Sequence, residues 1–210
     1  MLQGLESLSV QQQVEMLQVF TGLETANRYR VVDPNGNELM FTYEESGFLG
    51  RQFLGGRRPL TLNFIDGKGQ RLMVAKRKFF WFFSHLDFYS PEGSLLGSMV
   101  RRFKAIGRQF DVYDDQEQVG SIHGPMLRPN TFWFRRDGNE LAKITKRWSG
   151  LSREMFTAAD TFSVEFTDQM ASEPLRWLIL GAAMAIDLDF FERRGRRGVG
   201  FGALSLLFRR

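Results

Sequence analysis

The chain of 210 residues contains no cysteine and only two histidines. Without cysteine there can be no disulfide, no thiolate metal site and no cysteine nucleophile. In His85-Leu-Asp87, an imidazole and a carboxylate would share one face of a strand, but no nucleophile accompanies them. The sequence also contains no phosphate-binding loop and no glycine-flanked serine elbow. We therefore do not expect an enzyme.

Long hydrophobic runs are absent too, and two largely apolar stretches, 177–186 and the glycine-rich 199–208, are each ten residues long. About 20 apolar residues are needed to cross the hydrocarbon core of a bilayer. Because the run 177–186 has no polar face, a helix formed by it must be enclosed by other protein. The carboxylates of Asp187 and Asp189 follow the run at once. These observations predict a buried C-terminal helix over residues 174–191.

A linker rich in proline, glycine and serine is lacking between candidate domains, which predicts one main domain. We assign residues 1–22 to an N-terminal helical segment, 23–192 to the main domain and 193–210 to a basic, apolar tail. Ser9 and Gln12 form a capping-box pattern, which predicts an amphipathic helix over residues 9–20. The N-terminus lacks the basic flank and apolar core of a secretory signal, so we expect a cytoplasmic location.

Positive charge is concentrated in two blocks, although the net charge is only +4. Residues 51–110 carry 12 basic and 3 acidic groups, and residues 193–210 carry 6 basic groups and none acidic. This segregation predicts an anionic partner such as a membrane surface, a lipid headgroup or nucleic acid. The acidic excess in the flanking blocks counts against nucleic acid, although aromatics among the cations also describe a single-strand platform. Solvated surface charge is the alternative for both blocks.

Five polar turns divide the centre of the chain into short strands. They begin at Asp33, Asp66, Ser90, Asp114 and Asp137, at intervals of 33, 24, 24 and 23 residues. In each turn Asp or Ser favours initiation, and glycine usually supplies a positive φ. The interval fits a hairpin plus its return connection, which predicts a long antiparallel meander. Such a sheet tends to close, because closure removes its edges, and a closed barrel would enclose the C-terminal helix.

Four motifs give the chain a resemblance to the phospholipid scramblase family, over about residues 5–192. In the family's order they are Gln11-Gln-Gln-Val-Glu-Met-Leu, Thr21-Gly-Leu-Glu-Thr-Ala-Asn-Arg-Tyr, Lys146-Arg-Trp-Ser-Gly-Leu-Ser-Arg-Glu-Met-Phe-Thr-Ala-Ala-Asp-Thr-Phe and Ala185-Ile-Asp-Leu-Asp-Phe-Phe-Glu. The resemblance implies the Tubby-like fold, a closed antiparallel β-barrel of about 12 strands around a hydrophobic C-terminal helix. The implied activity is energy-independent, bidirectional movement of phospholipids between leaflets. Because the fold's other relatives bind phosphoinositides, a lipid-binding or tethering module without transport is the alternative.

The resemblance also implies calcium as a ligand. The family's calcium segment corresponds to Ala158, Asp160, Phe162, Val164, Phe166 and Gln169, and both end positions have lost the family's aspartate. The remaining carboxylates are those of Asp160, Glu165 and Asp168. Calcium prefers six to eight oxygen ligands, so the motif is degraded. The alternation of Phe162, Val164 and Phe166 favours a core strand instead.

Basic and aromatic residues predict contact with anionic lipid at the cytoplasmic face of a membrane. Guanidinium and ammonium groups attract phosphate, and aromatic rings enter the interface. The predicted anion-binding residues are Arg57, Arg58, Lys76, Arg77, Lys78, Arg101, Arg102 and Lys104. The predicted membrane contacts are Phe79, Phe80, Trp81, Arg193, Arg194, Arg196, Arg197 and Phe201. The alternatives are aromatics that point into the barrel, ordinary surface charge and a disordered tail.

Overall fold

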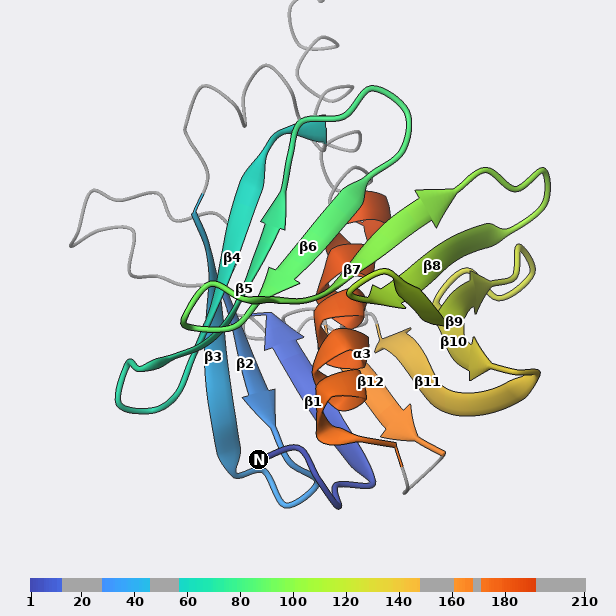
Figure 1. Ribbon diagram of the computed structural model, residues 1–210. Helices are drawn as coiled ribbons and strands as arrows, with labels where there is room; N and C mark the ends of the chain where they lie inside the picture. Colours follow the sequence, from blue (N-terminus) through green and yellow to red (C-terminus); the bar gives the residue numbers. More distant parts are fainter. Residues whose placement is uncertain (13–27, 46–56, 148–160, 168–170, 192–210) are drawn as a thin grey trace, which may run out of the picture.

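The computed structural model describes residues 1–12, 28–45, 57–147, 161–167 and 171–191, with twelve strands and a C-terminal helix (Figure 1). The strands are β1 (Ser7–Gln12), β2 (Arg28–Val32), β3 (Glu38–Glu45), β4 (Leu60–Ile65), β5 (Arg71–Arg77), β6 (His85–Tyr89), β7 (Leu95–Arg102), β8 (Arg108–Asp114), β9 (Glu117–Gly124), β10 (Thr131–Arg136), β11 (Asn139–Arg147) and β12 (Thr161–Phe166). The helix α3 (Glu173–Ile186) continues as a π-helical turn, η2 (Asp187–Phe191).

The strands form a closed barrel in which consecutive strands pair antiparallel and β1 pairs with β12. At the closure, Leu8 lies opposite Val164 and Val10 lies opposite Phe162, and all four side chains are buried. Since neither β1 nor β12 is left with an open edge, the barrel has no edge strand. The predicted fold class, a closed antiparallel barrel of about 12 strands around a C-terminal helix, is confirmed.

The prediction of an N-terminal helix is wrong over residues 9–12, because they belong to the strand β1. Leu8 and Val10 alternate with half-buried polar residues, which is the period of a strand. The capping-box pattern of Ser9 and Gln12 is therefore incidental, and the pairing with β12 decides the conformation. Residues 13–20 of the predicted helix lie outside the described residues.

The five predicted turns all join paired strands. The Asp33 carboxylate accepts hydrogen bonds from the backbone N–H groups of Asn35 and Asn37, each at 2.8 Å. In the third turn the Ser90 hydroxyl accepts a hydrogen bond from the backbone N–H of Ser94 at 3.3 Å, and the Ser90 N–H donates to the Ser94 carbonyl at 2.8 Å. Between β10 and β11, Asp137 and Gly138 have φ values of 49° and 82°, the conformation of a two-residue hairpin that matches strand twist.

The two ends of the barrel differ in their connections. Because strand direction alternates, the five short turns lie at one end, which we call the turn end. The connections 78–84, 103–107 and 125–130 lie at the other end, which we call the loop end. Figure 1 shows the loops after β5 and β7 at the same end of the molecule as the C-terminal part of α3, opposite the N-terminus. The helix therefore runs through the barrel from the turn end to the loop end.

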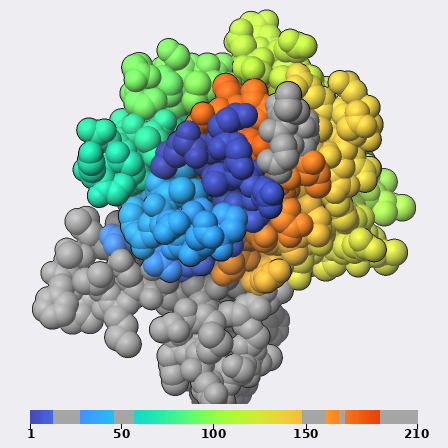
Figure 2. All heavy atoms as spheres, turned by 90° about the horizontal axis from the view of Figure 1, so that it is seen from below, coloured from blue at the N-terminus to red at the C-terminus, as the bar shows by residue number. Residues whose placement is uncertain are grey.

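N-terminal residues cover the turn end (Figure 2, dark blue) and hold the start of α3. Glu173 Oε1 accepts a hydrogen bond from the backbone N–H of Leu2 at 3.1 Å. The fully buried guanidinium of Arg176 donates to the backbone carbonyls of Ala171 and Leu5, at 3.0 and 2.6 Å. Since all five donors of a guanidinium seek partners, these carbonyls allow a charged side chain to lie inside the barrel.

The helix α3 fills the interior. Residues 178–186 are all buried, on every face of the helix, as the lack of a polar face predicted. The wall contributes fully buried aromatic rings, among them Phe64, Phe88, Phe110 and Phe132. The predicted C-terminal helix is confirmed, with its last turn in the wider π conformation.

The helix lies close to the wall at Gly181, and replacing this glycine by alanine is expected to destabilise the protein by about 1–3 kcal/mol. An added Cβ would lie 2.3 Å from the Phe88 ring, which is itself fully buried. This overpacking outweighs the gain of about 1 kcal/mol in helix propensity. Urea denaturation measures the loss in the free energy of unfolding.

Two further variants test the cause of that loss. Gly67 has open space around its Cβ position and no positive φ, so Gly67→Ala should change stability by less than about 0.5 kcal/mol. Adding Phe88→Leu to Gly181→Ala should restore part of the lost stability. A neutral Gly181→Ala variant would contradict the close packing of helix and wall.

Candidate functional site

At the loop end, two carboxylates anchor the end of the helix to the barrel wall. Asp187 Oδ1 lies 2.8 Å from Lys146 Nζ on β11, and Asp187 Oδ2 accepts a hydrogen bond from the Tyr29 hydroxyl on β2 at 2.7 Å. Asp189 Oδ1 lies 2.6 Å from Arg77 Nη1 on β5, and the Ser84 hydroxyl donates to Asp189 Oδ2. The end of the helix is therefore tied to the strands β2, β5 and β11 and, through Ser84, to the loop 78–84.

A third ion pair completes this buried ion-pair cluster, which consists of Asp187–Lys146, Asp189–Arg77 and Glu44–Arg58. Arg58 Nη2 lies 2.6 Å from Glu44 Oε1, and both side chains are fully buried. Arg77 Nη2 also faces the backbone carbonyl of Arg58, at 3.4 Å. Three cations therefore face three carboxylates, and a buried charge that is paired and hydrogen-bonded is tolerated.

The cluster corrects three of the predicted surface residues. Arg58 and Arg77 were predicted to bind an external anion, but they lie inside the barrel and bind the protein's own carboxylates. Phe80 was predicted to contact a membrane, but it is buried and its ring lies 5.3 Å from the Arg77 guanidinium. For Arg77 the prediction is wrong because strand alternation turns its side chain inward, opposite to the exposed side chain of Lys76.

The other predicted cations lie at the loop end, on the outside of the barrel. Arg57, Lys76, Lys78, Arg102 and Lys104 are exposed, and Arg101 is half-buried. Arg102 is engaged within the protein, since its Nε lies 2.6 Å from Asp111 Oδ2 and its Nη2 donates to the Tyr113 hydroxyl. The hydrogen bond that Arg102 donates to the Asp111 carboxylate is the main cause that raises the pKa of Arg102 above its ordinary value. The remaining cations give the loop end positive charge where β4, β5 and β7 meet it.

Large apolar side chains project from the same end. In the loop 78–84, Trp81 is 68% exposed and Phe82 is 83% exposed, and the rings of Phe79 and Trp81 meet edge to face at 5.1 Å. The next two loops expose Phe103, Ile106, Met126 and Leu127, the last at 95%. Exposed apolar side chains gathered at one end of a molecule mark an interaction surface.

Phe79 and Trp81 were predicted to contact a membrane, but Phe82 and the exposed apolar residues of the other two loops were not. An isolated apolar residue in a polar connection has no periodicity, so it gives no strand or helix signal. The one usable sign in the sequence is the placement of Phe103 between Arg102 and Lys104, an apolar side chain bracketed by cations. The predicted tail contacts Arg193, Arg194, Arg196, Arg197 and Phe201 lie outside the described residues.

The predicted calcium segment is a core strand where the structure describes it. Phe162, Val164 and Phe166 are buried in β12, as their alternation predicted. Glu165 lies opposite Lys143 on β11, with Oε2 at 3.3 Å from Nζ. In the described part of the chain there is no group of three histidine, aspartate or glutamate residues that could hold a metal ion. Asp160 and Asp168 lie outside the described residues, as do Ala158 and Gln169, so the calcium site stays a prediction.

Comparison with known proteins identifies the family of this chain. The sequence matches the scramblase family over residues 1–193. The chain belongs to the scramblase family. Phospholipid scramblase 1 of Mus musculus is 30% identical over 96% of this chain and 66% of its own length. Phospholipid scramblase 1 of Homo sapiens is 27% identical over 92% of this chain and 65% of its own length.

A third relative of this scramblase-family chain is not named as a scramblase. Altered inheritance rate of mitochondria protein 25 of Saccharomyces cerevisiae is 28% identical over 91% of this chain and 72% of its own length. An X-ray structure of a protein from Arabidopsis thaliana has a TM-score of 0.48 and 13% identity, over 89% of this chain and 91% of that chain. This chain thus spans roughly two thirds of the length of the phospholipid scramblases it matches.

The last of the four family motifs has a visible structural role in this chain. Residues 185–191 of that motif form the end of α3 and the turn η2, and they supply Asp187 and Asp189 to the buried ion-pair cluster. None of the helices in the described ranges combines the length and the apolarity that a bilayer span requires.

Proposed function

We propose that this chain acts at the cytoplasmic face of a membrane as a phospholipid scramblase, moving phospholipids between leaflets in both directions without an energy source. The observation that carries the proposal is the loop end, where exposed apolar side chains from three loops stand among exposed cations. Membership of the scramblase family supplies the class of activity. The proposed partners are anionic phospholipids.

The loop end suits this role physically. Each basic residue near an anionic leaflet contributes about 1 kcal/mol of attraction, and Lys78 and Lys104 directly flank exposed aromatics. Trp81 and Phe82 have the amphipathic or apolar rings that enter the headgroup region. In this orientation polar groups of the loop end face a locally thinned bilayer and lower the barrier to headgroup passage, with no bond made or broken.

A lipid-binding or tethering module without transport is the second candidate, and the buried ion-pair cluster favours it. A helix held inside a barrel by paired charges cannot at the same time cross a bilayer. If transport requires α3 to leave the barrel, the cluster opposes that step, and the chain would bind lipid without moving it.

A dithionite-quench assay on liposomes with a headgroup-labelled lipid separates the two candidates. Purified protein is reconstituted, and dithionite removes the label that is accessible from outside. Quenching well beyond half of the label supports scrambling, because inner-leaflet lipid must have reached the outside. Quenching that stops near half, with the protein still bound to the vesicles, supports the binding module and contradicts scrambling.

Calcium is expected to change the quenching rate by less than about twofold, because few of the ligands a calcium ion needs remain in the segment. The measurement compares excess calcium with a chelator. The same comparison is made with the variant Glu165→Gln, because the Glu165 carboxylate is already paired with Lys143. A rate that rises at least tenfold with calcium would contradict this expectation and would point to Asp160, Glu165 and Asp168 as ligands.

A further inference from the structure

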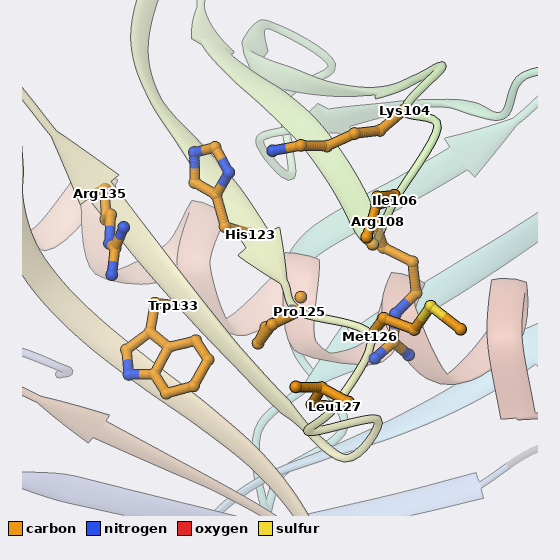
Figure 3. Close-up of a pocket in the computed structure, with 11 residues that line it drawn as sticks. Lys104, Ile106, Arg108, His123, Pro125, Met126, Leu127, Trp133 and Arg135 are labelled. Atoms are coloured by element: carbon orange, nitrogen blue, oxygen red, sulfur yellow. The ribbon is translucent and has the colours of Figure 1, made fainter.

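A pocket of about 400 Å³ lies on the outer wall of the barrel, between the loops 103–107 and 125–130 (Figure 3). Its walls come from the end of β9, the start of β8 and the strand β10. Figure 3 shows the Lys104 side chain reaching from its loop toward His123, with Trp133 and Arg135 on the neighbouring strand. The pocket lies apart from the buried ion-pair cluster, because its side chains face outward from β8, β9 and β10.

The lining of this pocket is cationic. Among the described residues that line it are Lys104, Arg108 and Arg135, and no carboxylate. Arg108 is positioned by a hydrogen bond from Nη2 to the Pro129 carbonyl at 2.7 Å and by the Phe132 ring at 4.3 Å. Arg135 lies 4.0 Å from Glu140, at the limit of an ion pair. Three positive side chains around one hollow complement a phosphate group.

The pKa of His123 depends in part on the positive charge that lines this pocket. Burial is the main cause that lowers the pKa of His123 below its ordinary value, and the positive charges of Lys104 and Arg135 lower it further. Asp111 acts in the opposite direction but does not reverse the shift. His123 Nε2 lies 2.8 Å from the Ser121 hydroxyl. An anion placed beside Lys104 and Arg135 would weaken their effect and raise this pKa.

The rim of the pocket is apolar. Ile106, Met126 and Leu127 line it and are also among the most exposed apolar residues of the molecule. A small soluble anion would not need such a rim. A headgroup attached to acyl chains would, because the rim can rest in the interfacial region while the phosphate enters the pocket.

We infer that this pocket binds the phosphate of a single phospholipid headgroup, with Lys104, Arg108 and Arg135 as its ligands and Ile106, Met126 and Leu127 in the membrane interface. The inference rests on the proposed function, because it requires the loop end to face a membrane. It adds a defined headgroup site to a surface that would otherwise attract anionic lipid only through its overall charge.

The test uses the full chain and vesicles of phosphatidylcholine with phosphatidic acid, whose headgroup is a bare phosphate. Lys104→Ala combined with Arg135→Ala is expected to weaken vesicle binding about tenfold or more, since each lost cation removes about 1 kcal/mol, or about fivefold. The matched control is Lys68→Ala with Arg71→Ala, which removes the same charge from exposed positions at the turn end. The control should change binding less than about twofold. Equal losses in both variants would overturn the pocket and leave only overall charge.

A second measurement separates lipid from free phosphate. Glycerol 3-phosphate is added to the chain, and the ring signals of the two histidines are followed by NMR as a function of pH. Binding in the pocket should raise the pKa of His123 and leave His85, which does not line it, unchanged. Ile106→Ser with Leu127→Ser should weaken vesicle binding but not this response. Unchanged vesicle binding in the rim variant would overturn a lipid source and favour a soluble phosphate.

The outcomes also distinguish a failure of the headgroup site from a failure of the proposed function. If the wild-type chain binds no vesicles, the proposed function fails and the headgroup site fails with it. If the wild type binds vesicles and Lys104→Ala with Arg135→Ala binds equally well, only the pocket is overturned. Tighter, salt-sensitive binding to single-stranded oligonucleotides than to vesicles would overturn the lipid assignment in favour of nucleic acid.

Discussion

Replacing Asp189 by asparagine is expected to lower the free energy of unfolding by about 3–5 kcal/mol. The change keeps the shape of the side chain, so it opens no cavity. It leaves the buried guanidinium of Arg77 without the carboxylate that now lies 2.6 Å away. An uncompensated charge in the interior costs far more than the net value of the pair. Urea denaturation followed by tryptophan fluorescence measures the loss.

Two comparisons show whether charge is the cause. Adding Arg77→Met to Asp189→Asn removes both charges and should recover a large part of the stability, which a double-mutant cycle quantifies. Glu165→Gln breaks an exposed ion pair with Lys143, whose side chains are 45% and 38% exposed, and should cost less than about 1 kcal/mol. A loss below about 1 kcal/mol for Asp189→Asn would mean that water reaches Arg77.

The Asp189→Asn variant also distinguishes two routes of transport. If α3 must leave the barrel, weakening its anchor raises the quenching rate while stability falls. If the barrel works closed, the quenching rate per folded molecule stays the same. We expect the second result, because Lys146 and Tyr29 still hold Asp187.

Replacing Trp81 and Phe82 together by serine is expected to weaken binding to anionic vesicles by about 30-fold or more. Fully burying one large apolar side chain contributes about 1.5–3 kcal/mol, and partial burial of two rings in the interface contributes at least about 2 kcal/mol. Both rings are exposed in the free protein, so their removal should leave the barrel stable. Co-sedimentation over a series of protein concentrations measures the affinity.

The matched control lies at the opposite end of the barrel. Leu95 is exposed at the start of β7, next to the turn 90–94, and Leu95→Ser should leave vesicle affinity unchanged. A loss of affinity equal to that of the loop variant would show that the membrane contact is not confined to the loop end. Full affinity in the Trp81 and Phe82 variant would remove that loop from the contact.

The parts of the fold that the sequence predicted are those set by local chemistry. Asp33 and Gly138 carry their turn preferences regardless of what lies elsewhere. The apolar run 177–186 has no polar face, so it must be enclosed by other protein, whichever elements surround it. The conformation of residues 9–12 depends instead on β12, about 150 residues away, and no local pattern reports that partner.

The sequence predicted the kind of residues in the candidate site but not which of them lie together. Lys76, Arg77 and Lys78 are consecutive, and a strand must send the middle one to the opposite face, so one inward cation was foreseeable. Its partner was not, because Asp189 comes 112 residues later. The pocket beside Lys104 was missed for the same reason, since it forms only where β8, β9 and β10 lie side by side.

The order in which the chain builds its barrel has a consequence for synthesis. Among the described elements, the strand that closes the sheet and the helix that fills it leave the ribosome after all the others. Until then, ten or more strands form an open sheet whose inner aromatic face has nothing to cover it. Such an intermediate exposes strand edges and apolar surface. It is therefore prone to aggregation and is expected to bind chaperones. Nascent chains halted before α3 should therefore be found bound to chaperones, and release should coincide with emergence of the helix.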